Sequence, residues 1–153
     1  MKRRISWFMV VALALSAWSA PMQAAQKSLE ELKAEADKAT GGQQAKLCME
    51  VARMLVDLAN QQFADGNVDQ AQATIQEVLN YAAKAHSAAL QSHNRMKETE
   101  MALYKTKRRM EEVRHTLSIE DTPPLEGVEK KLEQFRQDLL DAMFASPKKE
   151  KKS

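Results

Sequence analysis

The stretch that decides the fold runs from Val68 to Asp121 and reads VDQAQATIQEVLNYAAKAHSAALQSHNRMKETEMALYKTKRRMEEVRHTLSIED. It contains neither glycine nor proline, the residues least favourable inside a helix. Apolar or small side chains recur along it at alternating steps of three and four, the seven-residue repeat of packed helices. They are Val68, Ala71, Ile75, Val78, Ala82, Ala85, Ala89, Ser92, Met96, Thr99, Leu103, Thr106, Met110, Val113 and Leu117. The pattern predicts one continuous helix of roughly 50 residues, about 75 Å long.

The segments on either side supply helices against which this stretch can pack, because a helix of this length cannot bury its apolar stripe against itself. Before it, apolar residues from Ala45 to Phe63 follow helical spacing, and Gly66 is suited to end that helix. After it, Pro123 suits the first turn of a helix whose stripe runs from Leu125 to Ala142. Short turns make neighbouring helices antiparallel. We therefore expect an all-α fold: an extended antiparallel three-helix bundle or coiled coil built on one long central helix.

A shorter helical segment precedes these helices. Ser28 and Glu31 have the spacing of a capping box, and apolar residues continue at helical spacing as far as Ala39. Gly41 and Gly42 then interrupt the pattern, since each glycine costs about 1 kcal/mol in a helix interior. We expect a break or a kink there. If the chain runs on straight, this first segment lies too far along to cover the helix that begins at Val68.

The N-terminal residues 1–24 have the pattern of a secretory signal peptide. Lys2, Arg3 and Arg4 precede an apolar run from Ile5 to Ala17, and small residues follow. The run is short for a membrane span, which needs about 20 residues, and an uncleaved anchor is the alternative. We expect export to the periplasm or the extracellular space, with no stable membrane span after cleavage. Residues 25–145 then form one helical domain, and the basic tail 146–153 is expected to be disordered.

Charge and cysteine usage exclude some classes of function. The full chain has 23 basic and 21 acidic residues, but residues 1–24 carry three basic and no acidic ones, so the apparent basicity belongs to the targeting segment. Nucleic-acid binding is therefore not expected. Cys48 is the single cysteine, which excludes an intramolecular disulfide. It occupies an apolar position of its helix, so we interpret it as a buried core residue; an intermolecular disulfide or a redox thiol is the alternative.

The first helical hairpin resembles one unit of a known repeat family. Residues 52–79 combine large and small residues in one helix with a Gly-Asn turn and a small residue in the next, namely Leu55, Leu58, Ala59, Gly66, Asn67, Ala71 and Ile75. This arrangement is similar to a single tetratricopeptide-type hairpin. The family's closing proline is absent, and no second copy follows, whereas stable arrays need about three repeats. The resemblance implies binding of a protein or a peptide.

No residue pattern points to catalysis, so we do not expect an enzyme. Nucleophile elbows, phosphate-binding glycine loops and helical zinc motifs are all missing from the sequence. His86 and His93 lie about 10.5 Å apart along a helix, too far to share one metal ion. The basic cluster of residues 105–109 is partly balanced by Glu111 and Glu112; we interpret it as a solvated face, with an acidic partner surface as the alternative.

These observations favour an exported, noncatalytic helical interaction or scaffold protein that binds another protein or itself, with no cofactor implied. The alternative is a periplasmic metal- or cofactor-binding helical bundle that uses histidine and methionine side chains. A pair of helices leaves apolar side chains exposed beside its seam, and such surfaces mark partner sites. The candidate partner surface on the thinly covered half of the central helix and its neighbour consists of Leu79, Tyr81, Leu90, Met54 and Leu47.

Overall fold

The computed structural model describes residues 27–145, so the expected signal peptide (1–24) and tail (146–153) lie outside the described residues. The described part is all-α, as predicted, with five α-helices, one 3-10 turn and no strand. The elements are α1 (Leu29–Lys38), α2 (Gly41–Ala64), α3 (Val68–Ser92), α4 (Met96–Arg114), η1 (Ile119–Asp121) and α5 (Pro123–Phe144). Within residues 27–145, no helix combines the length and apolar character that a membrane crossing requires.

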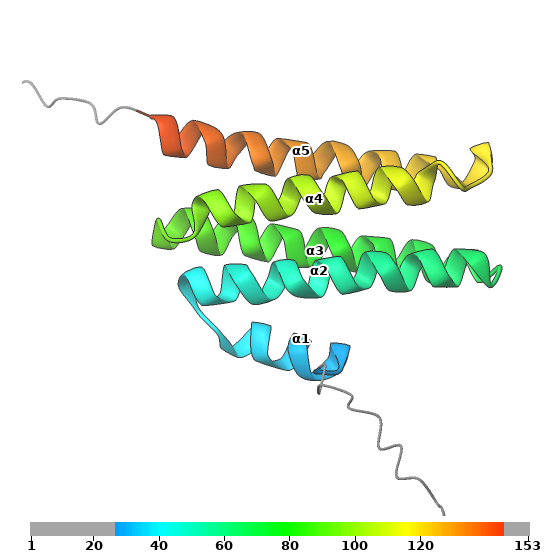
Figure 1. Ribbon diagram of the computed structural model, residues 1–153, viewed down its shortest axis with the longest axis horizontal. Helices are drawn as coiled ribbons and strands as arrows, with labels where there is room; N and C mark the ends of the chain where they lie inside the picture. Colours follow the sequence, from blue (N-terminus) through cyan, green and yellow to red (C-terminus); the bar gives the residue numbers. More distant parts are fainter. Residues whose placement is uncertain (1–26, 146–153) are drawn as a thin grey trace, which may run out of the picture.

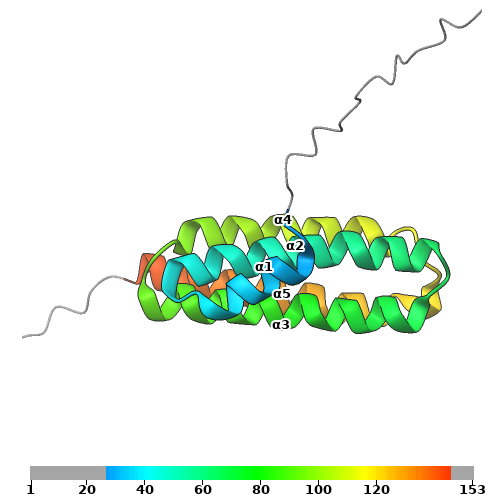
Figure 2. The same ribbon diagram turned by 90° about the horizontal axis from the view of Figure 1, so that it is seen from below.

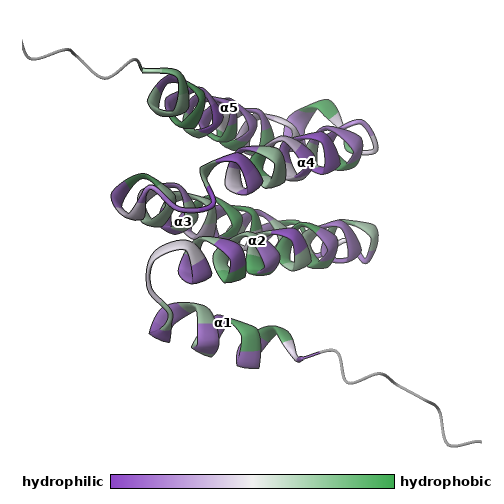
Figure 3. Ribbon diagram, turned by 60° about the vertical axis from the view of Figure 1, so that its left-hand side comes forward, coloured by the Kyte–Doolittle hydropathy of each residue, from purple (hydrophilic) through white to green (hydrophobic). Residues whose placement is uncertain are grey.

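The helices are arranged in three layers (Figures 1 and 3). The α2–α3 hairpin forms the middle layer, α4–α5 packs on one of its faces, and the short α1 packs on the other. Across the first of these boundaries, α2 lies beside α4 and α3 lies beside α5. Because the chain reverses at each turn, α2 and α4 run in the same direction, as do α3 and α5. The apolar core lies between the layers.

The prediction of one continuous helix from Val68 to Leu117 is wrong, because the chain turns back at residues 93–95. Helix α3 ends at Ser92 and α4 begins at Met96, while His93 and Arg95 have left-handed φ angles of 50° and 57°. The Ser92 hydroxyl donates a hydrogen bond to the carbonyl of Ala88 (2.6 Å) and accepts one from the Asn94 N–H (3.3 Å). The long central helix is therefore replaced by two antiparallel helices.

Burial explains why the turn is favourable. A non-glycine residue in the left-handed region costs roughly 1–2 kcal/mol, and there are two of them. In return, the chain reversal lets α4 bury Leu103, Met110 and Val113, each at most 2% exposed. Full burial of one such side chain contributes about 1.5–3 kcal/mol. Three of them outweigh the backbone strain, whereas a straight helix would leave this stripe without α2 and α3 beneath it.

The break expected at Gly41 and Gly42 is present, but the chain reverses there instead of running straight. Gly41 has a φ of +57° and begins α2. Helix α1 begins with the predicted capping box between Ser28 and Glu31 and folds back over α2 and α3 (Figure 2). Two ion pairs tie it to α3: Lys33 to Glu77 at 2.7 Å and Asp37 to Lys84 at 2.8 Å. The first segment therefore covers the face that it was expected to leave open.

Small side chains bring α2 and α3 close together. Seven alanines of these two helices are 0% exposed: Ala45, Ala52, Ala59, Ala71, Ala82, Ala85 and Ala89. Gly66, with a φ of +79°, makes the turn between the helices as predicted. Near this turn the Thr74 hydroxyl donates a 2.7 Å hydrogen bond to the Gln62 amide oxygen, which satisfies two buried polar groups.

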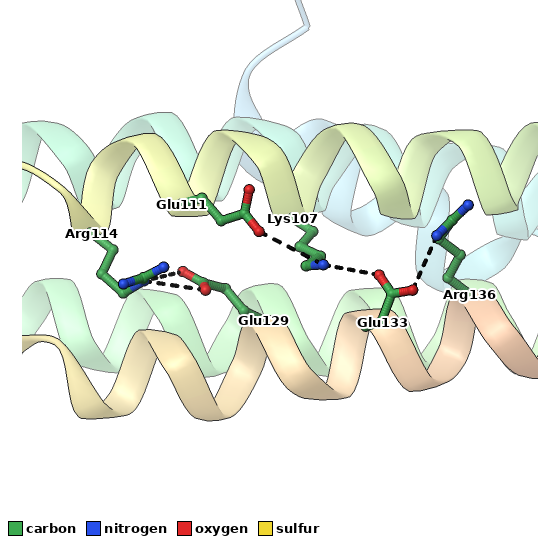
Figure 4. A network of polar contacts seen from close by, with 6 residues as sticks. All are labelled: Lys107, Glu111, Arg114, Glu129, Glu133 and Arg136. Atoms are coloured by element: carbon green, nitrogen blue, oxygen red, sulfur yellow. Dashed lines mark hydrogen bonds and ion pairs between the residues drawn. The ribbon is translucent and has the colours of Figure 1, made fainter.

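Ion pairs connect α4 to α5 (Figure 4). Lys107 lies 3.0 Å from Glu133, and Arg114 lies 2.9 Å from Glu129. Arg136 pairs with Glu133 on its own helix and with Glu100 on α4. The hydrogen bond from Lys107 lowers the pKa of Glu133 and keeps this carboxylate charged.

Candidate interaction surface

The five residues of the predicted partner surface do not form an exposed apolar flank. Leu47 and Tyr81 are buried, at 9% and 8% exposure, and Leu79, Leu90 and Met54 are half-buried against the core. For Leu47, Met54 and Tyr81, the physical reason is the position of α1. Its Leu32 lines one groove together with Leu47 and Met54, and its Asp37 lies in the same hollow as Tyr81. The structure thus brings Leu47 and Met54 together and places Tyr81 on the other side of α1.

A different surface is open to solvent: the groove between the parallel helices α2 and α4. It encloses about 420 Å³. Buried Met49 and Val56 from α2, with Ala102 and Thr106 from α4, form its mostly apolar floor. Charged side chains form its rim, namely Lys46, Glu50, Arg53 and Asp57 from α2 and Lys105 and Arg109 from α4. We refer to these ten residues as the α2–α4 groove.

The rim of the α2–α4 groove carries four basic side chains and only two acidic ones. Asp57 accepts a hydrogen bond from Arg109 at 3.2 Å, and the same carboxylate is 4.0 Å from Arg53. The contact between Asp57 and Arg109 joins the two parallel helices across the groove. Arg53 and Lys105 are both exposed and line the groove from α2 and α4, respectively.

The basic cluster of residues 105–109 divides into paired and unpaired members. Lys107 points to α5 and pairs with Glu133, while Arg109 pairs with Glu112 and Asp57. Lys105 and Arg108 are exposed, and no ion pair within residues 27–145 involves either of them. The same holds for Lys46 on the opposite side of the α2–α4 groove. Only part of the cluster is therefore neutralised internally.

His86 and His93 are well separated and have different environments. His86 stacks on Phe135 of α5, with ring centroids 4.7 Å apart, and its Nε2 lies 3.3 Å from an oxygen of Asp138. The orientation of these two groups does not make a hydrogen bond, so the buried Nε2 has no partner in that geometry. Burial lowers the pKa of His86, although the nearby Asp138 carboxylate opposes this shift. His93 lies at the exposed turn after α3.

The other candidate ligands lie apart as well. Cys48 is fully buried, which raises the pKa of its thiol to about 11 and disfavours the reactive thiolate. Met110 is buried, while Met96 and Met143 are half-buried. In the described part of the chain, no group of three or more histidine, cysteine, aspartate or glutamate side chains is placed to hold a metal ion.

The α2 side of the groove was not among the predicted surface residues. Lys46, Glu50, Arg53 and Asp57 recur at steps of four, three and four, which places them on one face of a helix. This charged stripe could be read from the sequence, but its neighbour α4 could not, because residues 96–114 were expected to continue α3 as one straight helix that extends past the end of α2. No model of a protein family, no curated protein and no solved structure matches this chain.

Proposed function

We propose that this protein is an exported, noncatalytic helical interaction protein that binds another protein, or a second copy of itself, through the α2–α4 groove. The observation that carries the proposal is the combination of an apolar floor with a charged, exposed rim. The central part of a protein interface is apolar and its rim is polar. The buried side chains of Met49 and Val56 lie at the base of such a site, with basic groups around them.

The resemblance of residues 52–79 to a tetratricopeptide-type hairpin supports the same proposal. Helices α2 and α3 pass through these residues as an antiparallel hairpin, and α4–α5 forms a second hairpin beside it with matching helix directions (Figure 1). Stacked helical hairpins present extended binding surfaces in repeat proteins. The α2–α4 groove lies where the first helices of the two hairpins meet.

Site-specific crosslinking in cells tests this function. A photoreactive residue replaces Lys105 at the rim of the groove, and in the control it replaces Lys130, an exposed lysine of α5. We expect one discrete crosslinked protein from position 105 and none from position 130, with mass spectrometry identifying it as another protein or as this chain. Equal crosslinking from both positions, or none from position 105, contradicts the proposal.

A further inference from the structure

We propose that the α2–α4 groove binds an acidic amphipathic helix of a partner protein. This inference rests on the proposed function and names the chemistry of the partner. It follows from three properties of the groove: its length, the charge of its rim and the side chains of its floor.

The length of the groove suits a helix. Its lining residues on α2 extend from Lys46 to Asp57, which corresponds to about 16 Å along the helix axis. A partner helix of about three turns spans this distance. Charged side chains follow the groove on both sides, at Lys46 and Arg53 on one helix and Lys105 and Arg109 on the other. An elongated occupant contacts all four, whereas a compact small molecule reaches only one end.

The charge of the rim favours an acidic occupant. Arg53 and Lys105 line the groove from α2 and α4, and the Asp57 carboxylate contacts both Arg53 and Arg109, while Arg109 also pairs with Glu112. The Arg53 side chain is 62% exposed, and its ion pair with Asp57 at 4.0 Å is a weak one. A partner carboxylate beside Arg53 or Lys105 would add an attractive contact to a rim with four basic and two acidic side chains.

The floor favours an amphipathic helix over a nucleic acid. Methionine side chains adapt readily to an inserted apolar group, and Met49 lies at the floor with half-buried Ala102, while Val56 is fully buried. Leucine-type side chains at helical spacing would fill this floor, as in other complexes where a helix occupies a groove. No aromatic residue lines the groove for base stacking.

The test uses the purified mature chain and synthetic helical peptides of about 18 residues with a leucine and alanine stripe. One labelled peptide carries glutamate on both flanks of the stripe, and its matched control carries lysine. We expect saturable binding of the acidic peptide by fluorescence anisotropy, no binding of the basic one, and weaker binding at high salt. Anionic phospholipid vesicles serve as a further probe, because lipid headgroups also carry negative charge.

Charge reversal locates the site. Arg53→Glu and Lys105→Glu should each lower the affinity for the acidic peptide about tenfold, while Lys130→Glu on α5 should leave it unchanged. Circular dichroism confirms folding, and the neutral variant Lys105→Gln should give an intermediate loss. An acidic peptide that fails to bind, or vesicles that bind while the peptide does not, would overturn the inference. If crosslinks from position 105 persist in that case, the proposed function stands and only the partner's chemistry is wrong.

Discussion

The two hairpins are held together by different forces. Helices α2 and α3 pack through fully buried alanines, and among the described residues no ion pair joins them. Helices α4 and α5 bury a stripe of larger side chains and are connected along their exposed edge by the ion pairs of Lys107, Arg114 and Arg136. The first hairpin therefore depends on shape and the second depends in part on charge, which predicts different responses to mutation, salt and pH.

The largest effect is expected from enlarging a small residue in the α2–α3 hairpin. Ala85 is 0% exposed and lies on α3 among residues that let the helices approach closely. Ala85→Leu should lower the free energy of unfolding by about 3 kcal/mol, because the added atoms force the helices apart. Urea denaturation measures this loss. Ala83→Leu, at a half-buried position on the same helix, is the control, and an equal loss there would show that the tight alanine packing is not specific.

The α4–α5 hairpin should respond to loss of an ion pair. Arg114 is 24% exposed at its side chain and donates to Glu129, which is 9% exposed. Arg114→Ala should cost about 1 kcal/mol, because it leaves the Glu129 carboxylate without its partner. The double variant Arg114→Ala/Glu129→Ala should lose less than the sum of the two single variants. The loss should shrink at high salt, whereas that of Ala85→Leu should not. Equal salt dependence of the two variants would remove the distinction between the hairpins.

The turns of the chain differ in how well the sequence predicted them. Gly66 marks the α2–α3 turn, and the capping box at Ser28 marks the start of α1, since each requires a recognisable residue type. The turn at 93–95 uses neither glycine nor proline. The seven-residue repeat also continues through Ser92, Met96 and Thr99, so the pattern keeps its phase across the break. Tertiary burial of α4 decides this turn, and local propensity does not reveal it.

That missed turn also explains the error in the candidate surface. On a straight chain, Leu47 and Tyr81 would lie on uncovered flanks, and α2 would have no neighbour besides α3. The reversal at Gly41 brings α1 over Leu47 and Tyr81, while the reversal at 93–95 brings α4 beside α2 and creates the α2–α4 groove. Predicting a groove between two helices requires their spatial neighbours as well as their individual faces.

The contact between the two hairpins should make stability depend on pH. His86 of α3 packs against Phe135 and Asp138 of α5, and burial lowers the pKa of His86 below 6.5. The unfolded chain therefore binds a proton at a higher pH than the folded chain does. The stabilisation that neutral, buried His86 contributes to the folded state is complete above pH 6.5. It declines as the pH falls from 6.5 toward the lowered pKa of His86 in the folded chain. Thermal melts between pH 7.5 and 5.5 should show this decline in the wild type, and it should be smaller in His86→Phe.

The smallest predicted effect is that of Arg95→Gly on the free energy of unfolding. Its sign differs between the two-helix structure and a continuous helix. Arg95 has a left-handed φ of 57°, a conformation that glycine adopts without strain. Arg95→Gly should therefore raise the free energy of unfolding by about 0.5 kcal/mol, because relief of strain slightly exceeds the entropy that glycine adds to the unfolded chain. In a continuous helix the same substitution would cost about 1 kcal/mol. Lys97→Gly, inside the first turn of α4, is the matched control and should be destabilising. A loss at position 95 equal to that at position 97 would mean that the chain does not turn there, and that α4 does not lie beside α2.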